Sequence, residues 1–90
     1  AYGTLKNFDA NLEQALTASA AIFGENTPRH ANTLIDIAEV YNQYGYYRKS
    51  RELLTKAEAI INQEEQPDPV IKTKHVLETA EAMIGQGFCN

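Results

Sequence analysis

The sequence predicts an all-α protein of about four helices. Three observations support this fold class. Apolar residues recur at the three- and four-residue intervals of an amphipathic helix, and few stretches read as strands. Thr27-Pro28 and Asp68-Pro69 mark two helix starts, because the first side chain can cap the helix and proline needs no hydrogen bond there. Gly3, Gly45 and Gly87 are spaced by 42 residues, which indicates a repeated turn.

The first predicted helix runs from roughly Thr4 to Phe23 and ends before Gly24, since helices commonly stop at a residue with a left-handed backbone. The second begins at Thr27-Pro28 and ends at Gly45. Both carry a stripe of residues expected to face the core. In the first helix these are Leu5, Phe8, Leu12, Ala15, Leu16, Ser19 and Ile22, and in the second Leu34, Ile37, Ala38 and Tyr41.

The third predicted helix runs from about Tyr47 to Gln63, and the polar stretch "NQEEQPDP" follows it. The fourth begins at Asp68-Pro69 and ends at about Gln86. The residues expected to face the core are Ser50, Leu53, Leu54, Ala57, Ile60 and Ile61 in the third helix, and Val76, Thr79, Ala80 and Met83 in the fourth.

A shift of 42 residues superimposes the predicted helices on one another. The matched pairs include Leu12 with Leu54, Ala15 with Ala57, Leu34 with Val76, Ala38 with Ala80 and Tyr41 with Met83. The segment "QYGYYRKS" is therefore interpreted as the turn between two packed helices. Gly45 lets the chain reverse tightly, and the flanking tyrosines are expected to pack on neighbouring helices while their hydroxyls stay in water.

The helix pair around this turn resembles a tetratricopeptide repeat. It reads Leu34-x2-Ile37-Ala38-x2-Tyr41, then Gly45 with Tyr47, then Ser50-x3-Leu54-x2-Ala57, with a serine at one of the family's alanine positions. The period of 42 is longer than the usual one of about 34, and it is similar to the kinesin-light-chain type of repeat.

The resemblance implies a right-handed solenoid of antiparallel helix pairs, an alpha-alpha superhelix. Residues 1–26 would be the second helix of one repeat, residues 27–67 a complete helix pair, and residues 68–90 the first helix of the next repeat. The chain is therefore expected to be a slice of a longer array.

In this family the first helix of each pair lines a groove that binds peptides. Carried over to this sequence, the groove would be lined by Asn32, Ile35, Glu39, Asn42, Gln43, Lys74, Leu77, Glu81 and Ile84. Ile35 and Leu77 are apolar, lie off the predicted core stripe and are 42 residues apart, as are Glu39 and Glu81. Such a row suits a peptide with apolar and basic residues. The alternative is that Ile35 and Leu77 pack against the neighbouring helix.

Composition argues against several other classes of function. The net charge is −4, and eight Lys and Arg are scattered among twelve acids, which disfavours nucleic-acid binding. No apolar run reaches the length of a membrane span, and the single cysteine, Cys89, favours a reducing, cytoplasmic compartment. His30 and His75 are expected on the solvated surface, away from other metal ligands. We therefore expect no catalytic site, no metal and no cofactor.

The sequence thus predicts a protein-interaction scaffold that binds a peptide or partner helix. The alternative is a regulatory or sensory repeat segment of a larger multidomain protein, such as a transcription regulator or signalling enzyme. Because the first and last predicted helices carry apolar stripes without a polar cap, self-association through these end helices is also expected.

Overall fold

The structure, a computed structural model, describes the backbone of residues 2–89 and the side chains of residues 7–87. It contains four helices, α1 (Tyr2–Phe23), α2 (Pro28–Gln43), α3 (Tyr47–Asn62) and α4 (Pro69–Cys89). Within residues 2–89 there is no strand, so the all-α prediction is confirmed. The predicted boundaries differ from these by only a few residues. The side chains of Leu5 and Cys89, named above, lie outside the described part.

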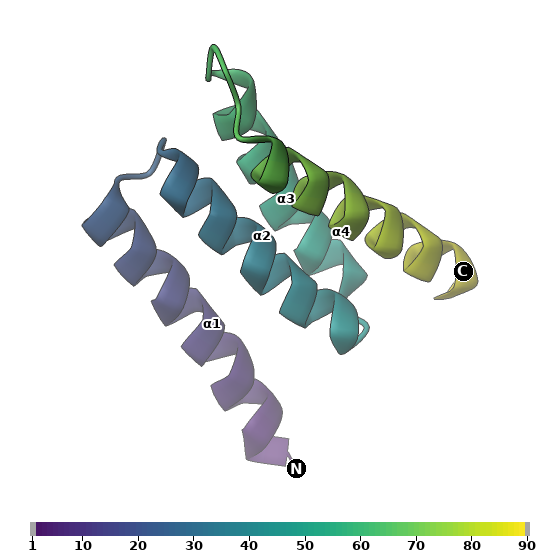
Figure 1. The fold of residues 1–90 in the computed structure, drawn as a ribbon. Helices are drawn as coiled ribbons and strands as arrows, with labels where there is room; N and C mark the ends of the chain where they lie inside the picture. The colour runs from purple at the N-terminus through teal and green to yellow at the C-terminus, as the bar shows by residue number, and fades with distance from the viewer. Residues whose placement is uncertain (1, 90) are drawn as a thin grey trace.

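Successive helices run in opposite directions, and α3 lies behind α2 and α4 in Figure 1. α2 contacts all three other helices, and α1 packs mainly on α2. The apolar core lies chiefly between α2 and α3. Its buried members are Ala31, Leu34, Ile35, Ile37, Ala38, Tyr41, Leu53, Leu54, Ala57, Ile60, Ile61 and, from α4, Ala82. The core stripes predicted for α2 and α3 are therefore confirmed. No helix in the described part is both long and apolar enough to cross a membrane.

The α1–α2 turn at Gly24 and the α2–α3 turn at Gly45 form where the sequence predicts them. The Thr27 hydroxyl accepts a hydrogen bond from the His30 backbone N–H at 3.3 Å and so caps α2. Gly24 and Gly45 have φ of 94° and 83°, in the left-handed region that favours glycine. Gly3 and Gly87, spaced 42 residues from Gly45, instead lie inside α1 and α4, so the prediction of a turn there is wrong.

An aromatic cluster joins the α2–α3 turn to α1. The Phe8 ring lies 5.0 Å from the Tyr44 ring centroid, 6.2 Å from that of Tyr41 and 6.3 Å from that of Tyr46. The Tyr41 hydroxyl donates to Asp9 at 2.6 Å, and Lys49 forms an ion pair with the same carboxylate at 2.5 Å. These contacts hold the pKa of Asp9 below its usual value. The tyrosine-rich turn therefore fixes α1 against the central helix pair.

α4 is rotated relative to the prediction. Val76, Ala80 and Met83 were expected to face the core, but all three are exposed. The opposite side of α4 is buried instead, through His75, Glu78 and Ala82, with Thr79 half-buried. The physical reason is the position of its neighbours. α4 rests on α2 and α3 with one side only, and in the described part nothing covers the other side.

Candidate protein-binding surface

α2 and α4 pack against each other and run in the same direction (Figure 1). Polar contacts join them. The Lys74 ammonium donates to the Asn32 amide oxygen at 2.7 Å and forms an ion pair with Asp36 at 2.5 Å. Lys74 and Asn32 are 42 residues apart, so equivalent positions of the repeat meet across the contact. The Asn42 amide donates to the Glu78 backbone carbonyl at 3.1 Å and to its carboxylate at 3.0 Å. These bonds set the rotation of α4.

The nine residues predicted to line a groove fall into three groups. Five are exposed, namely Glu39, Gln43, Leu77, Glu81 and Ile84. Asn32 and Lys74 are half-buried, because they bond to each other. Ile35 and Asn42 are buried between the helices and offer no surface to a partner. For Ile35 the alternative interpretation, packing against the neighbouring helix, is therefore the correct one. Leu77, its counterpart in α4, is free of such packing and exposed.

Carboxylates gather along the contact between α2 and α4. The Glu78 carboxylate raises the pKa of Glu39, because it can accept a hydrogen bond from the protonated Glu39 carboxyl and its negative charge repels the ionised one. Partial desolvation and the charge of Asp36 act in the same direction, while Lys74 opposes them. Asp36 and Glu78 thus both add negative charge near Glu39, and Lys74 is the cation that acts on Asp36 and Glu39. This excess of negative charge favours a partner that carries Lys or Arg.

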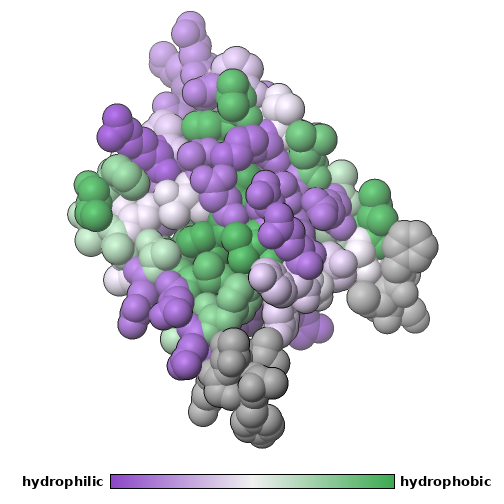
Figure 2. Space-filling model, turned by 60° about the horizontal axis from the view of Figure 1, so that its bottom comes forward, coloured by the Kyte–Doolittle hydropathy of each residue, from purple (hydrophilic) through white to green (hydrophobic). Residues whose placement is uncertain are grey.

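An apolar stripe runs along the outer side of α4. Val76, Leu77, Ile84 and Met83 have 62%, 61%, 59% and 55% of their surface exposed, and Ala80 between them is exposed as well. Their spacing of three, four and seven residues places them on one side of the helix. Figure 2 shows that hydrophobic residues reach the surface in several patches between hydrophilic side chains. An apolar surface of this extent on a small helical protein is typical of an interface.

A hollow of about 750 Å³ lies where α2 and α4 begin. Phe23, Val70 and Ile71 give it apolar walls, and Arg29, Lys74 and Asp68 bring charges of both signs. The Arg29 guanidinium lies over the Phe23 ring at 5.7 Å from its centroid. This hollow could not be predicted from the sequence, because it depends on how closely the starts of the two helices approach each other.

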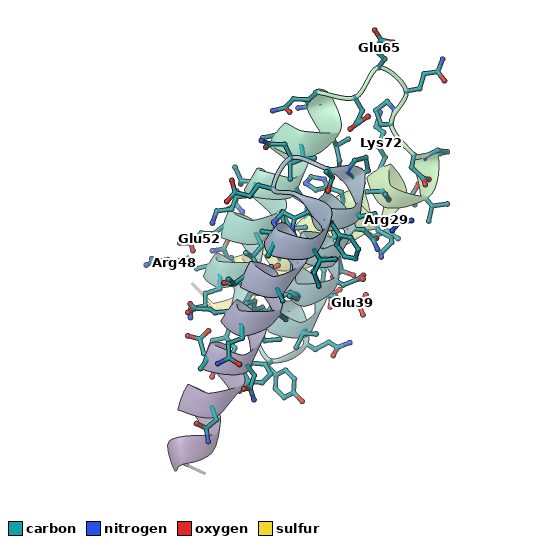
Figure 3. All side chains as sticks on the ribbon, turned by 90° about the vertical axis from the view of Figure 1, so that its left-hand side faces the viewer. Arg29, Glu39, Arg48, Glu52, Glu65 and Lys72 are labelled. Atoms are coloured by element: carbon teal, nitrogen blue, oxygen red, sulfur yellow. The ribbon has the colours of Figure 1, made fainter. Side chains whose placement is uncertain are left out.

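The charged side chains of α2 and α3 point to different sides of the molecule. In Figure 3, Arg29 and Glu39 point to one side, and Arg48 and Glu52 point to the opposite side. Arg29 lies in the first turn of α2 and Glu39 lies near its other end, so exposed charges of opposite sign stand near the two ends of this helix. A partner that spans it meets both signs of charge.

A second hollow, of about 880 Å³, lies between α1 and α3. Leu16, Ala20, Leu53 and Ile60 line it together with Lys56 and other residues. It exists because α1 packs on α2 and leaves its side toward α3 partly open. This hollow was not predicted from the sequence, although the apolar stripe of α1 was expected to be larger than the following helices can cover.

Both histidines are buried, so their predicted place on the solvated surface is wrong. His30 Nδ1 lies 2.9 Å from the Ser19 hydroxyl, which links α2 to α1. His75 Nε2 donates to the Leu54 backbone carbonyl at 2.8 Å, which links α4 to α3. Each ring therefore satisfies a polar group between helices. Among the described residues, no three His, Cys, Asp or Glu side chains are grouped so that they could hold a metal ion.

Asp36 and Glu78 belong to this surface and were absent from the predicted groove. They are 42 residues apart and both are acidic, so the 42-residue repeat could have identified them as candidate surface residues. Their role depends on contacts with Lys74 and Asn42 that cross from one helix to the other.

Comparisons with protein-family models, with curated proteins and with solved structures find no significant match to this chain. Its function therefore has to be inferred from the surface that α2 and α4 present.

Proposed function

We propose that this chain is a protein-interaction scaffold of the tetratricopeptide type, with its helix pairs stacked as a right-handed solenoid. The α2–α4 surface binds a partner helix or peptide that carries apolar and basic residues. The observation that carries the proposal is the exposed apolar stripe of α4, formed by Val76, Leu77, Ala80, Met83 and Ile84. The single cysteine of the sequence supports a reducing, cytoplasmic setting.

The stripe is large enough to drive association. Burying one exposed aliphatic side chain completely is worth about 1.5–3 kcal/mol. The four large side chains of the stripe are each somewhat more than half exposed, so covering them contributes on the order of 3–7 kcal/mol. The cost of association offsets much of this gain, which places the expected affinity at the weak end for a single partner.

The carboxylates add selectivity rather than much affinity. Glu81 is exposed on α4 between Leu77 and Ile84 in sequence, and Glu39 is exposed on the neighbouring helix α2. Charges at the rim of an interface mainly steer the encounter and exclude partners of like charge. A partner with Lys or Arg near its apolar residues is therefore favoured over an acidic one.

A selection from a displayed library of short helical peptides tests the proposal. We expect the selected peptides to carry apolar residues at helical spacing together with Lys or Arg. Leu77→Glu combined with Ile84→Glu should remove their binding. The matched control is Thr55→Glu combined with Asn62→Glu, which adds the same charges at the same seven-residue spacing on the exposed side of α3. Peptides that bind the Leu77 and Ile84 double variant as tightly as the unchanged protein would refute the proposed surface.

A further inference from the structure

The exposed stripe of α4 has a buried counterpart in α2. Moving back by 42 residues takes Val76, Leu77, Ala80, Met83 and Ile84 to Leu34, Ile35, Ala38, Tyr41 and Asn42. Every one of these five residues of α2 is buried, with 3% or less of its surface exposed. The same side of the same kind of helix is therefore covered in α2 and uncovered in α4.

The structure also identifies what covers this side of α2. α3 packs along it, α4 packs beside α3, and α1 adds contacts at Tyr41 through Phe8 and Asp9. α3 and α4, the helix pair that follows α2, therefore supply the cover that has no counterpart on α4. Asn42, for example, bonds to Glu78 of α4. The piece that is missing from α4 is consequently another pair of antiparallel helices with the spacing of α3 and α4.

The chain itself contains such a pair. α1 and α2 are the 42-residue counterparts of α3 and α4, and each runs in the same direction as its counterpart (Figure 1). On α1, the exposed residues Asn11, Ala15 and Ala18 correspond to Leu53, Ala57 and Ile60 of α3, which are buried. α1 therefore has a free side at the positions with which α3 contacts the core.

The small residues of the two helices also correspond. Ala38 of α2 and Ala57 of α3 are both fully buried, and such small side chains let two helix backbones approach closely. Their counterparts are Ala80 of α4 and Ala15 of α1, and both are exposed. A second molecule placed with its α1 on α4 would bring these two alanines together.

From these observations we infer that the α4 stripe binds the α1–α2 helix pair of a second copy of this chain, in a head-to-tail arrangement. This inference rests on the proposed binding function of α4 and names its partner. α1 of the second copy lies on α4 as α3 lies on α2, and its α2 covers Leu77 and Ile84. Because the two contacting surfaces differ, the contact is heterologous, and each added copy leaves a free α4 for the next.

A pair of complementary variants tests this arrangement. Val76→Glu with Met83→Glu blocks the α4 side, and Ala15→Glu with Ala18→Glu blocks the α1 side. All four residues are exposed, so these changes do not disturb the core. Light scattering after size exclusion, over a concentration series up to about 1 mM, the weak end of specific association, measures the mass of each species.

The unchanged protein should grow in mass with concentration, and each double variant alone should stay monomeric. An equimolar mixture of the two variants should form a dimer that grows no further, because one intact α4 side meets one intact α1 side. Thr55→Glu with Asn62→Glu, exposed on α3 and outside α1, α2 and α4, adds the same charge and should associate as the unchanged protein does.

Two results would overturn the inference. Association of the α1-blocked variant with itself would show that α4 pairs with α4 of another copy instead. A monomeric unchanged protein at every concentration would show that a second copy is not the occupant. If that monomer still selects apolar helical peptides through Leu77 and Ile84, only the inference fails and the proposed function stands.

Discussion

Replacing Ser50 by alanine is expected to stabilise the protein. Ser50 is fully buried in α3, and its hydroxyl has no hydrogen-bond partner among the residues that the structure describes. Leaving a buried polar group without a partner costs about 1–3 kcal/mol, and Ser50→Ala removes that group. Alanine is also the better helix former than serine by about 0.5 kcal/mol. The lost oxygen leaves only a small void, which subtracts part of the gain.

The net stabilisation expected for Ser50→Ala is about 1–2 kcal/mol of unfolding free energy. For a domain of this size, about 1 kcal/mol raises the melting temperature by roughly 4–8 °C. Urea unfolding followed by far-ultraviolet circular dichroism measures the free energy directly. The measurement belongs at low protein concentration, because self-association would add its own concentration-dependent stabilisation.

Thr55→Ala is the matched control for this prediction. Thr55 lies on the exposed side of the same helix, so its replacement changes helix propensity without removing a buried hydroxyl. Ser50→Ala should therefore stabilise the protein clearly more than Thr55→Ala does. If Ser50→Ala is instead less stable than the unchanged protein, its hydroxyl has a partner in solution and the reasoning is refuted.

Two further predictions concern the contacts of α2. Ala38→Phe should lower the unfolding free energy by about 1–3 kcal/mol, because Ala38 is fully buried and a phenyl ring there overpacks the core. An unchanged midpoint of urea unfolding would contradict this packing. Glu39→Gln should make stability less dependent on pH. Folding raises the pKa of Glu39 above its usual value of 4.5, so the folded state holds this proton more tightly than the unfolded state. This contribution to stability is complete below pH 4.5 and is lost as the pH rises through the raised pKa of Glu39. The stability of Glu39→Gln should therefore not show this decrease with rising pH. Parallel pH profiles for Glu39→Gln and the unchanged protein would disprove it, and Glu58→Gln on the exposed side of α3 is the control.

The helices and their turns could be predicted from local sequence signals. Thr27 with Pro28 caps and begins α2, and Gly24 and Gly45 adopt the left-handed backbone that their positions predict. Each of these signals acts over a few neighbouring residues, so no knowledge of the tertiary structure is needed to interpret it. The core stripes of α2 and α3 were equally predictable, since these two helices are neighbours in sequence and pack on each other.

The candidate surface could be predicted only in part. Leu77 and Glu81 were expected at the surface, and they are exposed. Ile35 was expected there by the same repeat argument, yet it is fully buried. Ile35 and Leu77 have the same place in the 42-residue repeat. The repeat does not show which of their two helices has a neighbour on that side.

The sequence by itself determined four helices, their caps and a 42-residue correspondence between them. The tertiary structure alone decided which side of each helix is buried. An apolar stripe lowers the free energy only where another surface covers it. The apolar stripe of α2 is covered by α3 and α4. α4 packs with the side on which His75 and Glu78 form hydrogen bonds, and its most apolar side stays exposed.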